Sequence, residues 1–341
     1  MRILLTSDLH LKKDRDERLQ AFVQILKVAK DKKVDRIIIA GDLFDSPGDA
    51  RRLRPDIRKL LAGNKIPIMA IPGNHDHDCY EENLDFGDNF VALVNKPLEI
   101  VDCGNVRFVG VPYFEGRIVD VITDLITARK KKVINILILH GSLDLTGFSR
   151  YDFGEEKEYR YLPITDDEIK ELKYNYILAG HFHTEPLLKK VGRTTFIYPG
   201  SPVVISKREV GRRYAYLVDT EGDPAPVLLK THYYQPIEIT IHPGKEKANL
   251  IELKKLIGEH DQTLAELKVT IRGFVKVAEK DFQGVINMIA GDIEVDGQWR
   301  QVSDLVSEPL YNRIQKRLAE ADFAPELKAK VEEMLIEAMI Q

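Results

Sequence analysis

Short runs of apolar residues recur along the first two thirds of the chain, and stretches with helical spacing separate them. The runs are apolar at nearly every position, which is typical of strands buried on both faces of a sheet. Helices are expected at residues 18–32 and 50–63, and a hairpin is expected to turn at Gly104 and Asn105. Strands are expected at residues 2–6, 36–40, 67–71, 107–111, 134–139 and 176–179. These elements predict an α/β fold in which helices cover a sheet.

A second alternation of strand and helix patterns begins near residue 233. It has the order β-α-β-α-β and predicts a small α+β domain. Two amphipathic helices follow, and Pro325 stands where the second of them would begin. Packing on their own domain and docking on another protein explain these two helices equally well. The sequence therefore predicts three parts, at residues 1–232, 233–300 and 301–341.

The composition is that of an ordinary globular protein, with 44% hydrophobic and 30% charged residues in 341. No apolar run is long enough to span a bilayer, and the N-terminal run is too short for a secretory signal, so a cytoplasmic protein without a membrane partner is expected. The net charge of −4 argues against a protein that coats nucleic acid, although a local basic groove is compatible with it. Cys79 and Cys103 are expected to be free thiols.

Polar residues with metal-binding side chains follow five of the predicted strands. A single histidine after a strand more often caps or hydrogen-bonds than binds a metal. Five clusters of oxygen and nitrogen donors without a cysteine favour a metal site instead, because the carboxyl ends of parallel strands meet at one edge of a sheet. The donors are Asp8, His10, Asp42, Asn74, His75, Asp76, His140, His181 and His183.

Five sequence blocks resemble the signature of the calcineurin-like metallophosphoesterase superfamily. They are DLH (8–10), GDLFD (41–45), GNHD (73–76), HG (140–141) and GHFH (180–183), in the family order over roughly residues 1 to 220. The resemblance implies a layered α/β fold, a β-sandwich flanked by helices, with two divalent metal ions. It implies a first ion held by Asp8, His10, Asp42 and His183, and a second held by Asp42, Asn74, His140 and His181.

The same resemblance implies the chemistry of the site. His75 would protonate the leaving oxygen, and Asp76 would orient His75. Two divalent ions can clamp a phosphoryl group and activate a hydroxide for attack on phosphorus. Oxygen and imidazole donors without thiolates suit Mn²⁺ first, and also Fe and Zn²⁺. We therefore expect a hydrolase that depends on two metal ions.

Longer forms of these blocks resemble one branch of the superfamily, the SbcD-type DNA double-strand-break repair nucleases. GDLFDSP and GNHD depart from the GDxxDRG and GNHE of its protein phosphatases, whereas TSDLHL, AGDLFDSP, PGNHDH, VPYF and YPGSP fit the nucleases. This branch implies exonuclease and single-strand endonuclease activity on DNA, in DNA repair. It also implies a cap domain that contacts DNA, a homodimer, and an SMC-like ATPase of the SbcC type that binds the C-terminal helices. Only about one helix separates GDLFD from GNHD, where the family's dimer interface lies, so the homodimer rests on a weaker match.

Other interpretations stay open at the level of sequence. The same site could hydrolyse a small phosphodiester such as a cyclic nucleotide, or the chain could be a DNA-binding scaffold that regulates an ATPase. The small α+β domain could also be an unrelated oligomerisation module, although the resemblance favours a cap. The aromatic and charged loop 147–163 is a candidate part of a site or an interface. Candidates for contacts with DNA phosphates are the basic pairs Lys189-Lys190, Lys207-Arg208 and Arg212-Arg213.

Overall fold

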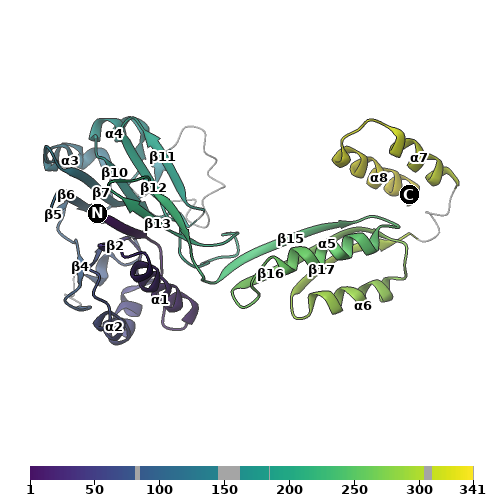
Figure 1. Cartoon of the computed structure of the whole chain (residues 1–341), viewed down its shortest axis with the longest axis horizontal. Helices are drawn as coiled ribbons and strands as arrows, with labels where there is room; N and C mark the ends of the chain where they lie inside the picture. Colours follow the sequence, from purple (N-terminus) through teal and green to yellow (C-terminus); the bar gives the residue numbers. More distant parts are fainter. Residues whose placement is uncertain (81–84, 145–161, 184, 303–308, 341) are drawn as a thin grey trace. The chain divides into compact units, whose positions relative to one another are not determined.

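The computed structural model describes residues 1–80, 85–144, 162–183, 185–302 and 309–340 (Figure 1). Its contacts divide the chain into two compact units, Met1–Tyr233 and Tyr234–Gln341. Except for its last two residues, the candidate loop 147–163 lies outside the described residues.

Two six-stranded sheets form the first unit. The first has the order β14-β13-β1-β2-β3-β4 and the second the order β11-β12-β10-β7-β6-β5. The first sheet contains β1 (Arg2–Thr6), β2 (Arg36–Ala40), β3 (Ile68–Ile71), β4 (Phe90–Ala92), β13 (Tyr214–Asp219) and β14 (Ala225–Leu228). The second contains β5 (Glu99–Cys103), β6 (Val106–Val111), β7 (Ile134–His140), β10 (Tyr176–Gly180), β11 (Leu187–Val191) and β12 (Thr194–Tyr198). Each of the six predicted strands is present, with its ends within one residue of the prediction.

The strands at the centre of each sheet run parallel, so that their carboxyl ends share one edge. In the first sheet β1, β2, β3 and β4 are parallel neighbours, and in the second β6, β7, β10 and β12 are. The predicted hairpin joins β5 to β6, and Cys103 pairs with Val106 across its two-residue turn. Cys79 and Cys103 are thiols and form no disulfide, as predicted. A two-stranded parallel pair, β8 (Leu143–Asp144) and β9 (Ile164–Thr165), completes the unit.

The two sheets pack face to face through apolar side chains that alternate along each strand. In β1, Ile3 and Leu5 belong to the core shared with Ile136 of the second sheet, whereas Leu4 belongs to a core under the helices. Successive side chains of a strand point to opposite faces of its sheet. A strand that is apolar at every position therefore needs a packed layer on each side. The continuous apolar runs of the sequence therefore correspond to a β-sandwich covered by helices, and the predicted fold class is confirmed.

Helices α1 (Asp16–Asp31) and α2 (Pro47–Ala62) pack on the outer side of the first sheet, and α3 (Ile122–Ala128) and α4 (Asp166–Leu172) on that of the second (Figure 1). Two short 3-10 helices, η1 (His77–Cys79) and η2 (Ile118–Val121), lie in the connections. Helix α1 begins two residues before the predicted start, and α2 begins three residues before it. Helix α2 begins earlier because of its N-cap. Ser46 accepts a hydrogen bond from the backbone N–H of Asp49, and Pro47 follows in the first turn.

The Ser46 cap gives a first testable expectation. Ser46→Ala should lower the stability of the first unit by about 0.5–2 kcal/mol, because the N–H of Asp49 loses its side-chain acceptor and keeps only the carbonyl oxygen of residue 46. A thermal melt should show a midpoint lower by roughly 2–4 °C per kcal/mol in a unit of this size. Ser46→Asn keeps a capping oxygen and serves as the matched control. A midpoint equally low in both variants would contradict the capping role.

The second unit begins with a β-α-β-α-β arrangement. It contains β15 (Tyr233–Ile241), α5 (Glu246–Gly258), β16 (Ala265–Val275), α6 (Glu279–Ala290) and β17 (Glu294–Gln301). The sheet has the order β15-β16-β17, and β16 and β17 run parallel. Leu253, Val269 and Phe282 lie in a core that the two helices share with the sheet.

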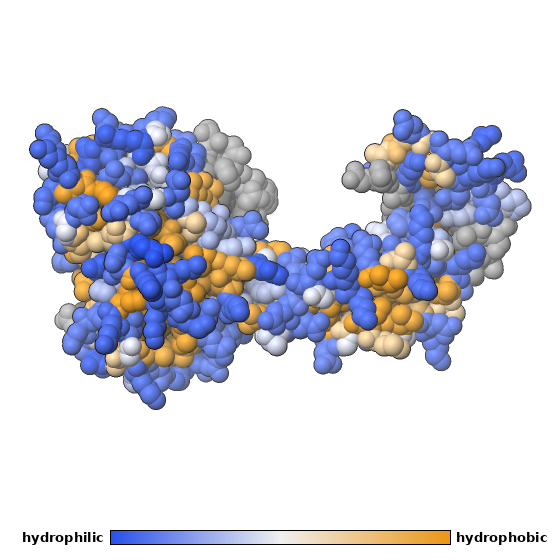
Figure 2. Space-filling model, in the orientation of Figure 1, coloured by the Kyte–Doolittle hydropathy of each residue, from blue (hydrophilic) through white to orange (hydrophobic). Residues whose placement is uncertain are grey.

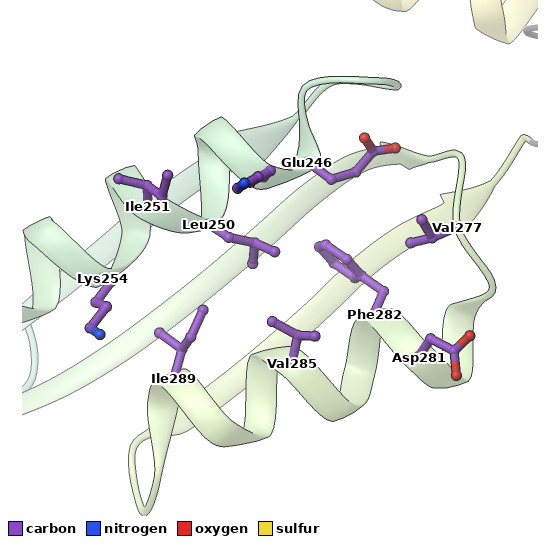
Figure 3. A pocket seen from close by; sticks show the side chains of 10 residues that line it. Glu246, Leu250, Ile251, Lys254, Val277, Asp281, Phe282, Val285 and Ile289 are labelled. Atoms are coloured by element: carbon purple, nitrogen blue, oxygen red, sulfur yellow. The ribbon is translucent and has the colours of Figure 1, made fainter.

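A groove of about 540 Å³ lies between α5 and α6. Leu250, Phe282 and Ile289 point into it from the two helices (Figure 3). The surface of the unit shows apolar residues over the same region (Figure 2), and the Ile251 side chain is 63% exposed there. The groove is the larger of the two described cavities, and it lies in the second unit.

Two helices end the chain, α7 (Pro309–Glu320) and α8 (Pro325–Ile340), so α8 begins at the predicted proline. They contact the rest of their own unit, because Tyr311 and Ile336 are buried together with Phe274 of β16. The Tyr311 hydroxyl donates to Glu332 at 3.0 Å and joins the two helices. Among the described helices, none is both long enough and apolar enough to cross a bilayer.

Candidate metal centre

The carboxyl ends of five strands bring the predicted metal ligands to one place. Asp8 and His10 follow β1, Asp42 follows β2 and Asn74 follows β3, all in the first sheet. In the second sheet, His140 ends β7, and His181 and His183 follow β10. Six of the seven are at most 4% exposed: Asp8, His10, Asp42, His140, His181 and His183. The centre therefore draws buried donors from both sheets of the sandwich.

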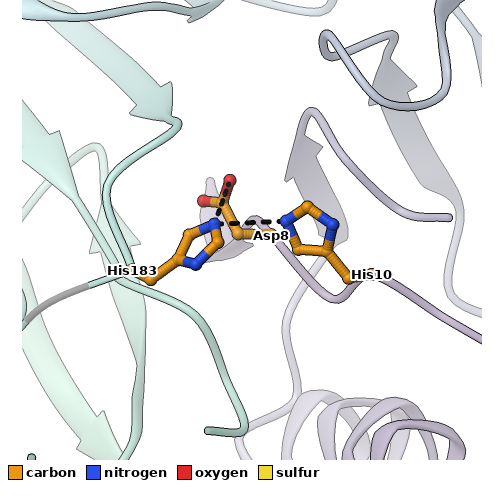
Figure 4. A group of neighbouring side chains, drawn as sticks. All are labelled: Asp8, His10 and His183. Atoms are coloured by element: carbon orange, nitrogen blue, oxygen red, sulfur yellow. Dashed lines mark hydrogen bonds and ion pairs between the residues drawn. The ribbon is translucent and has the colours of Figure 1, made fainter. Parts of the chain in front are cut away.

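One half of the centre is formed by Asp8, His10 and His183 (Figure 4). The Nε2 atoms of His10 and His183 are 3.1 Å apart, and Nε2 of His183 lies 3.7 Å from Oδ1 of Asp8. Donor atoms at such separations can all be ligands of one ion, because metal–ligand bonds of about 2 Å span this spacing. This group agrees with the first ligand set that the sequence blocks imply.

Asp42 lies between this group and the other half. Its Oδ2 atom is 3.7 Å from Nε2 of His10 and 3.2 Å from Nε2 of His140. Nε2 of His140 also lies 2.9 Å from Oδ1 of Asn74. The ring of His181 packs edge-on against that of His140, with centroids 5.4 Å apart. The Asp42 carboxylate thus lies close to donor atoms of both halves of the centre.

The backbone at the strand ends is held in a strained conformation. Asp8, His10, Asp42 and His181 have φ angles of 53°, 45°, 50° and 120°, in a region that residues other than glycine rarely adopt. Hydrogen bonds between the loops hold it there, since the N–H of Asp8 donates to Gly41 and that of His10 to Asp42. The N–H of His181 donates to both carboxylate oxygens of Asp8 at 3.1 Å. The strain turns each side chain from its strand into the centre.

The histidine rings are oriented by partners outside the centre. Nδ1 of His140 lies 2.9 Å from the carbonyl oxygen of Ala40, and Nδ1 of His183 lies 3.1 Å from Oε1 of Glu209. When Nδ1 donates to these acceptors, each Nε2 faces the centre with its lone pair, as a metal-bound histidine requires. Gly41 makes the first contact feasible, because a Cβ atom there would overlap the His140 ring. This pattern of oriented imidazoles fits a metal site.

The electrostatics of the buried carboxylates also fit a cation. Burial raises the pKa of Asp42, but the charges of His140 and His10 and a hydrogen bond from His140 bring it well below its usual value. Burial raises the pKa of Asp8. An ionised carboxylate away from water needs a compensating cation or hydrogen bonds. Divalent ions between these side chains would supply the compensating charge.

Asp76 holds the loop that carries Asn74 and His75. Its Oδ1 accepts from the N–H of Gly73 at 2.8 Å, and its Oδ2 accepts from the N–H of Leu43 at 2.9 Å and from the Tyr80 hydroxyl at 3.2 Å. Burial and the charge of Asp42 raise the pKa of Asp76 to about 7. These bonds tie the loop after β3 to the loop after β2. Asp76 therefore fixes the backbone on which His75 stands.

His75 lies at the edge of the centre and is partly exposed. Its backbone N–H donates to Oδ1 of Asp42 at 2.9 Å, and its ring lies edge-on to that of His10, with centroids 4.7 Å apart. One of its ring nitrogens lies within 4.8 Å of donor atoms of His10 and Asp42, so the ring is beside the predicted metal ligands.

Glu209 is a residue of the site that the sequence patterns did not indicate. It is 2% exposed, and besides His183 it accepts from the Ser201 hydroxyl at 3.2 Å and from the N–H of Ile205 at 2.9 Å. Burial raises the pKa of Glu209, but the hydrogen bond and charge of His183, the Ile205 N–H and the charge of Arg213 together bring it below its usual value. It lies within a basic run, and nothing local distinguishes it from a surface carboxylate.

One of the basic residues suggested for DNA contacts is placed differently. Arg213 is 2% exposed and donates to the carbonyl oxygens of His183 and Ser201, so the prediction that it contacts DNA phosphates is wrong. Its guanidinium also lies 3.6 Å from Glu209 and supports the loop behind His183. Lys207, Arg208 and Arg212 are exposed, and their predicted contacts with DNA stay predictions.

Glu209→Gln should weaken metal binding at the His183 side by about 10–100-fold, the usual effect of losing a carboxylate behind a metal-bound histidine. The amide keeps the size of the side chain but removes the charge that orients the His183 ring. Titration calorimetry with Mn²⁺ measures the affinity, and circular dichroism verifies the fold. Glu221→Gln, at an exposed glutamate, is the control. Equal affinities in all three proteins would contradict the orienting role.

Residues 1–185 match the profile of a family described as Calcineurin-like phosphoesterase. The DNA double-strand break repair protein Mre11 of Saccharolobus solfataricus is 27% identical in an alignment of 266 positions that covers 72% of this chain and 65% of that protein. The protein of the same name from Sulfurisphaera tokodaii is 26% identical in an alignment of 245 positions that covers 65% of this chain and 60% of that one. The chain therefore spans less than two thirds of the length of either relative.

The crystal structure of TT1561 of Thermus thermophilus is similar with a TM-score of 0.45 and 15% identity, over 67% of this chain and 98% of that one. The matched profile covers residues 1–185 of 341, more than half of the chain, and includes every predicted ligand. On this match, the chain is a member of the calcineurin-like phosphoesterase family, whose members are metal-dependent hydrolases.

Proposed function

We propose that the protein is a DNA nuclease that hydrolyses phosphodiester bonds, as an exonuclease and as a single-strand endonuclease, with two divalent metal ions. The observation that carries the proposal is the position of Asp42, buried between the His10 and His140 sides of one cluster. The choice of DNA is supported by the two relatives named as DNA double-strand break repair proteins.

Each ion has a proposed set of ligands. Asp8, His10, Asp42 and His183 would hold the first ion, and Asp42, Asn74, His140 and His181 the second. The bound ions supply the charge that polarises the phosphate and activates water. The oxygen and nitrogen donors favour Mn²⁺, and Fe or Zn²⁺ also suits them.

His75 is the proposed general acid. Its ring stands at the rim of the centre, and its backbone is fixed by the bond to Asp42. From there the imidazolium can hydrogen-bond to a phosphate oxygen and give its proton to the leaving oxygen. Asp76 would act as a positioning residue, because its hydrogen bonds hold the loop of His75 against the loop of Asp42.

Partners are proposed from the surfaces of the second unit. Apolar side chains of the C-terminal helices are exposed, with Leu310 at 52% and Met334 at 60%. Apolar residues that gather on a helix surface can mark a docking site, and we propose that Leu310, Phe323, Leu327 and Met334 bind the coiled coil of an SbcC-type ATPase. The domain 233–300 is proposed as a cap that contacts DNA, and the chain as a homodimer.

The test is cleavage of a labelled linear DNA duplex and of its single strand, with Mn²⁺, Fe²⁺ or Zn²⁺ added to metal-free protein. Degradation that needs a metal and stops with a chelator is expected. A small phosphodiester, bis-p-nitrophenyl phosphate, is assayed in parallel. If this ester is hydrolysed while both DNA substrates stay intact with every metal, the DNA nuclease proposal is wrong and a small substrate takes its place.

A further inference from the structure

We infer that a small pocket beside the metal centre binds one pyrimidine base of the DNA, next to the phosphate that is cleaved. The inference rests on the proposed nuclease function and adds a site for the base. The pocket has a volume of about 130 Å³ and is lined by Pro72, His77, Tyr80, Val94, Lys96, Pro112 and Tyr113.

The register of the sheet places this pocket next to the centre. Pro112 and Tyr113 follow β6, which runs parallel to β7, and Val111 is opposite Leu139. The next residues along the two strands are Pro112 and His140, so their backbones lie about 5 Å apart, the spacing of neighbouring strands. A nucleotide whose phosphate lies at His140 therefore has its base within reach of the pocket.

The other wall of the pocket is continuous with the loop of the predicted ligands. Pro72 follows β3 and precedes Asn74 by two residues, and Nδ1 of His77 lies 3.0 Å from the carbonyl oxygen of Asn74. The N–H of Tyr113 donates to the carbonyl oxygen of Pro72 at 3.2 Å and joins the two walls. The pocket and the metal centre thus share the loop after β3, which carries Pro72, Asn74 and His77.

The walls suit a flat aromatic ligand. His77 and Tyr113 both line the pocket, and their rings pack on each other with centroids 5.3 Å apart and planes at 52°. Tyr113 is 7% exposed and Tyr80 is tied to Asp76, so both walls have their shape before a ligand arrives. Bases bind to such surfaces by stacking, which every base allows through its π-face.

The volume of the pocket and the positive charge at its rim favour a ligand with a single ring. An apolar cavity of about 150 Å³ takes one benzene molecule, so this pocket matches a six-membered ring rather than a fused purine. Lys96 is exposed at the rim and has no ion pair or hydrogen bond with any residue that the structure describes. A pyrimidine base presents carbonyl oxygens at its edge, and the ammonium group of Lys96 is a donor for one of them.

The test uses the metal-loaded full chain and two single-stranded oligonucleotides of thymidine. In the second, one internal nucleoside is replaced by a tetrahydrofuran abasic analogue, which keeps the sugar-like ring and its phosphates but has no base. Wild type should cleave the phosphates beside that position roughly 5–100-fold more slowly than in the first, the effect of losing one stacked base. His77→Ala should slow cleavage beside the thymine to a similar extent. It should slow cleavage beside the abasic position little further, because the substitution and the loss of the base remove the same contact.

Lys96→Ala is the second variant, and Lys65→Ala, at an exposed lysine in the connection between α2 and β3, is the control. Lys96→Ala should act like His77→Ala with a smaller effect, and Lys65→Ala should behave as wild type. An oligonucleotide with adenine at the same position should be cleaved more slowly beside it than the thymine one.

The outcomes separate the two proposals. If wild type and variants cleave both oligonucleotides, with equal rates at thymine and abasic positions, the proposed base site is wrong and the proposed nuclease function is retained. Full additivity of the His77→Ala and abasic effects also overturns the base site. If no oligonucleotide is cleaved with any metal, the nuclease proposal fails, and the base site fails with it.

Discussion

His75→Ala is expected to lower kcat for DNA cleavage by about 10²–10⁴-fold and to leave the content of bound metal unchanged. The expected loss is that of a general acid, because the His75 ring stands at the rim of the centre and not among its buried ligands. Its backbone hydrogen bond to Asp42 remains in the variant, so the carboxylate stays in place. Single-turnover cleavage of a labelled duplex gives the rate, and mass spectrometry of the purified protein gives the metal content.

Two controls make this result specific. His260→Ala removes a histidine of the second unit and should leave the rate unchanged. A substrate with a p-nitrophenolate leaving group needs no proton donor, so His75→Ala should affect its hydrolysis much less than that of DNA. Equal losses on both substrates would rule out the acid role and point to binding of the phosphate instead.

Asp42→Asn is expected to remove both metal ions and all measurable nuclease activity. The affinity for Mn²⁺ should fall by more than about 100-fold, beyond the ~10–100-fold that is usual for a residue behind a ligand. The Asp42 carboxylate approaches both His10 and His140, and an amide supplies neither its charge nor its second acceptor oxygen. Equilibrium dialysis with Mn²⁺ measures the loss directly.

The fold of the variant is verified by its melting curve. Asp42→Asn should melt near the temperature of metal-free wild type, and Mn²⁺ should raise only the wild-type midpoint, because a ligand stabilises the state that binds it. Asp56→Asn, at the carboxylate of α2 that pairs with Lys13, is the matched control. An Asp42→Asn protein that binds two ions with wild-type affinity would refute the bridging position.

The strands of the first unit could be predicted because their signal is local. Each central strand is apolar on both faces and is followed by a polar cluster. Such clusters meet when the strands are parallel, because their carboxyl ends lie at the same edge of the sheet. Once the strands are parallel neighbours, as β1, β2 and β3 are, the convergence of Asp8, Asp42 and Asn74 follows from topology alone. The same signal located the small α+β domain, because its strands and helices alternate with clear periods.

The supporting residues could not be predicted, because their roles depend on contacts between distant segments. Glu209 meets His183 across 26 residues, and its neighbours in sequence are basic. Arg213 belongs to the same run as the exposed Arg208, yet one is buried and the other is not. Charge along a sequence does not reveal which side of a loop faces the interior. The hydrogen bonds of Asp76 to the loop after β2 could not be predicted either, because they also join segments that are distant in the sequence.

The division of the ligands between the two sheets has a mechanical consequence. Asp8, His10, Asp42 and Asn74 come from one layer of the sandwich, and His140, His181 and His183 from the other. Ions held by both sets would act as cross-links, and the layers could separate only after the ions leave. Loss of metal and loss of fold would then be coupled. In a cell starved of the ion, the protein would become a target for proteases, and its abundance would report on metal supply.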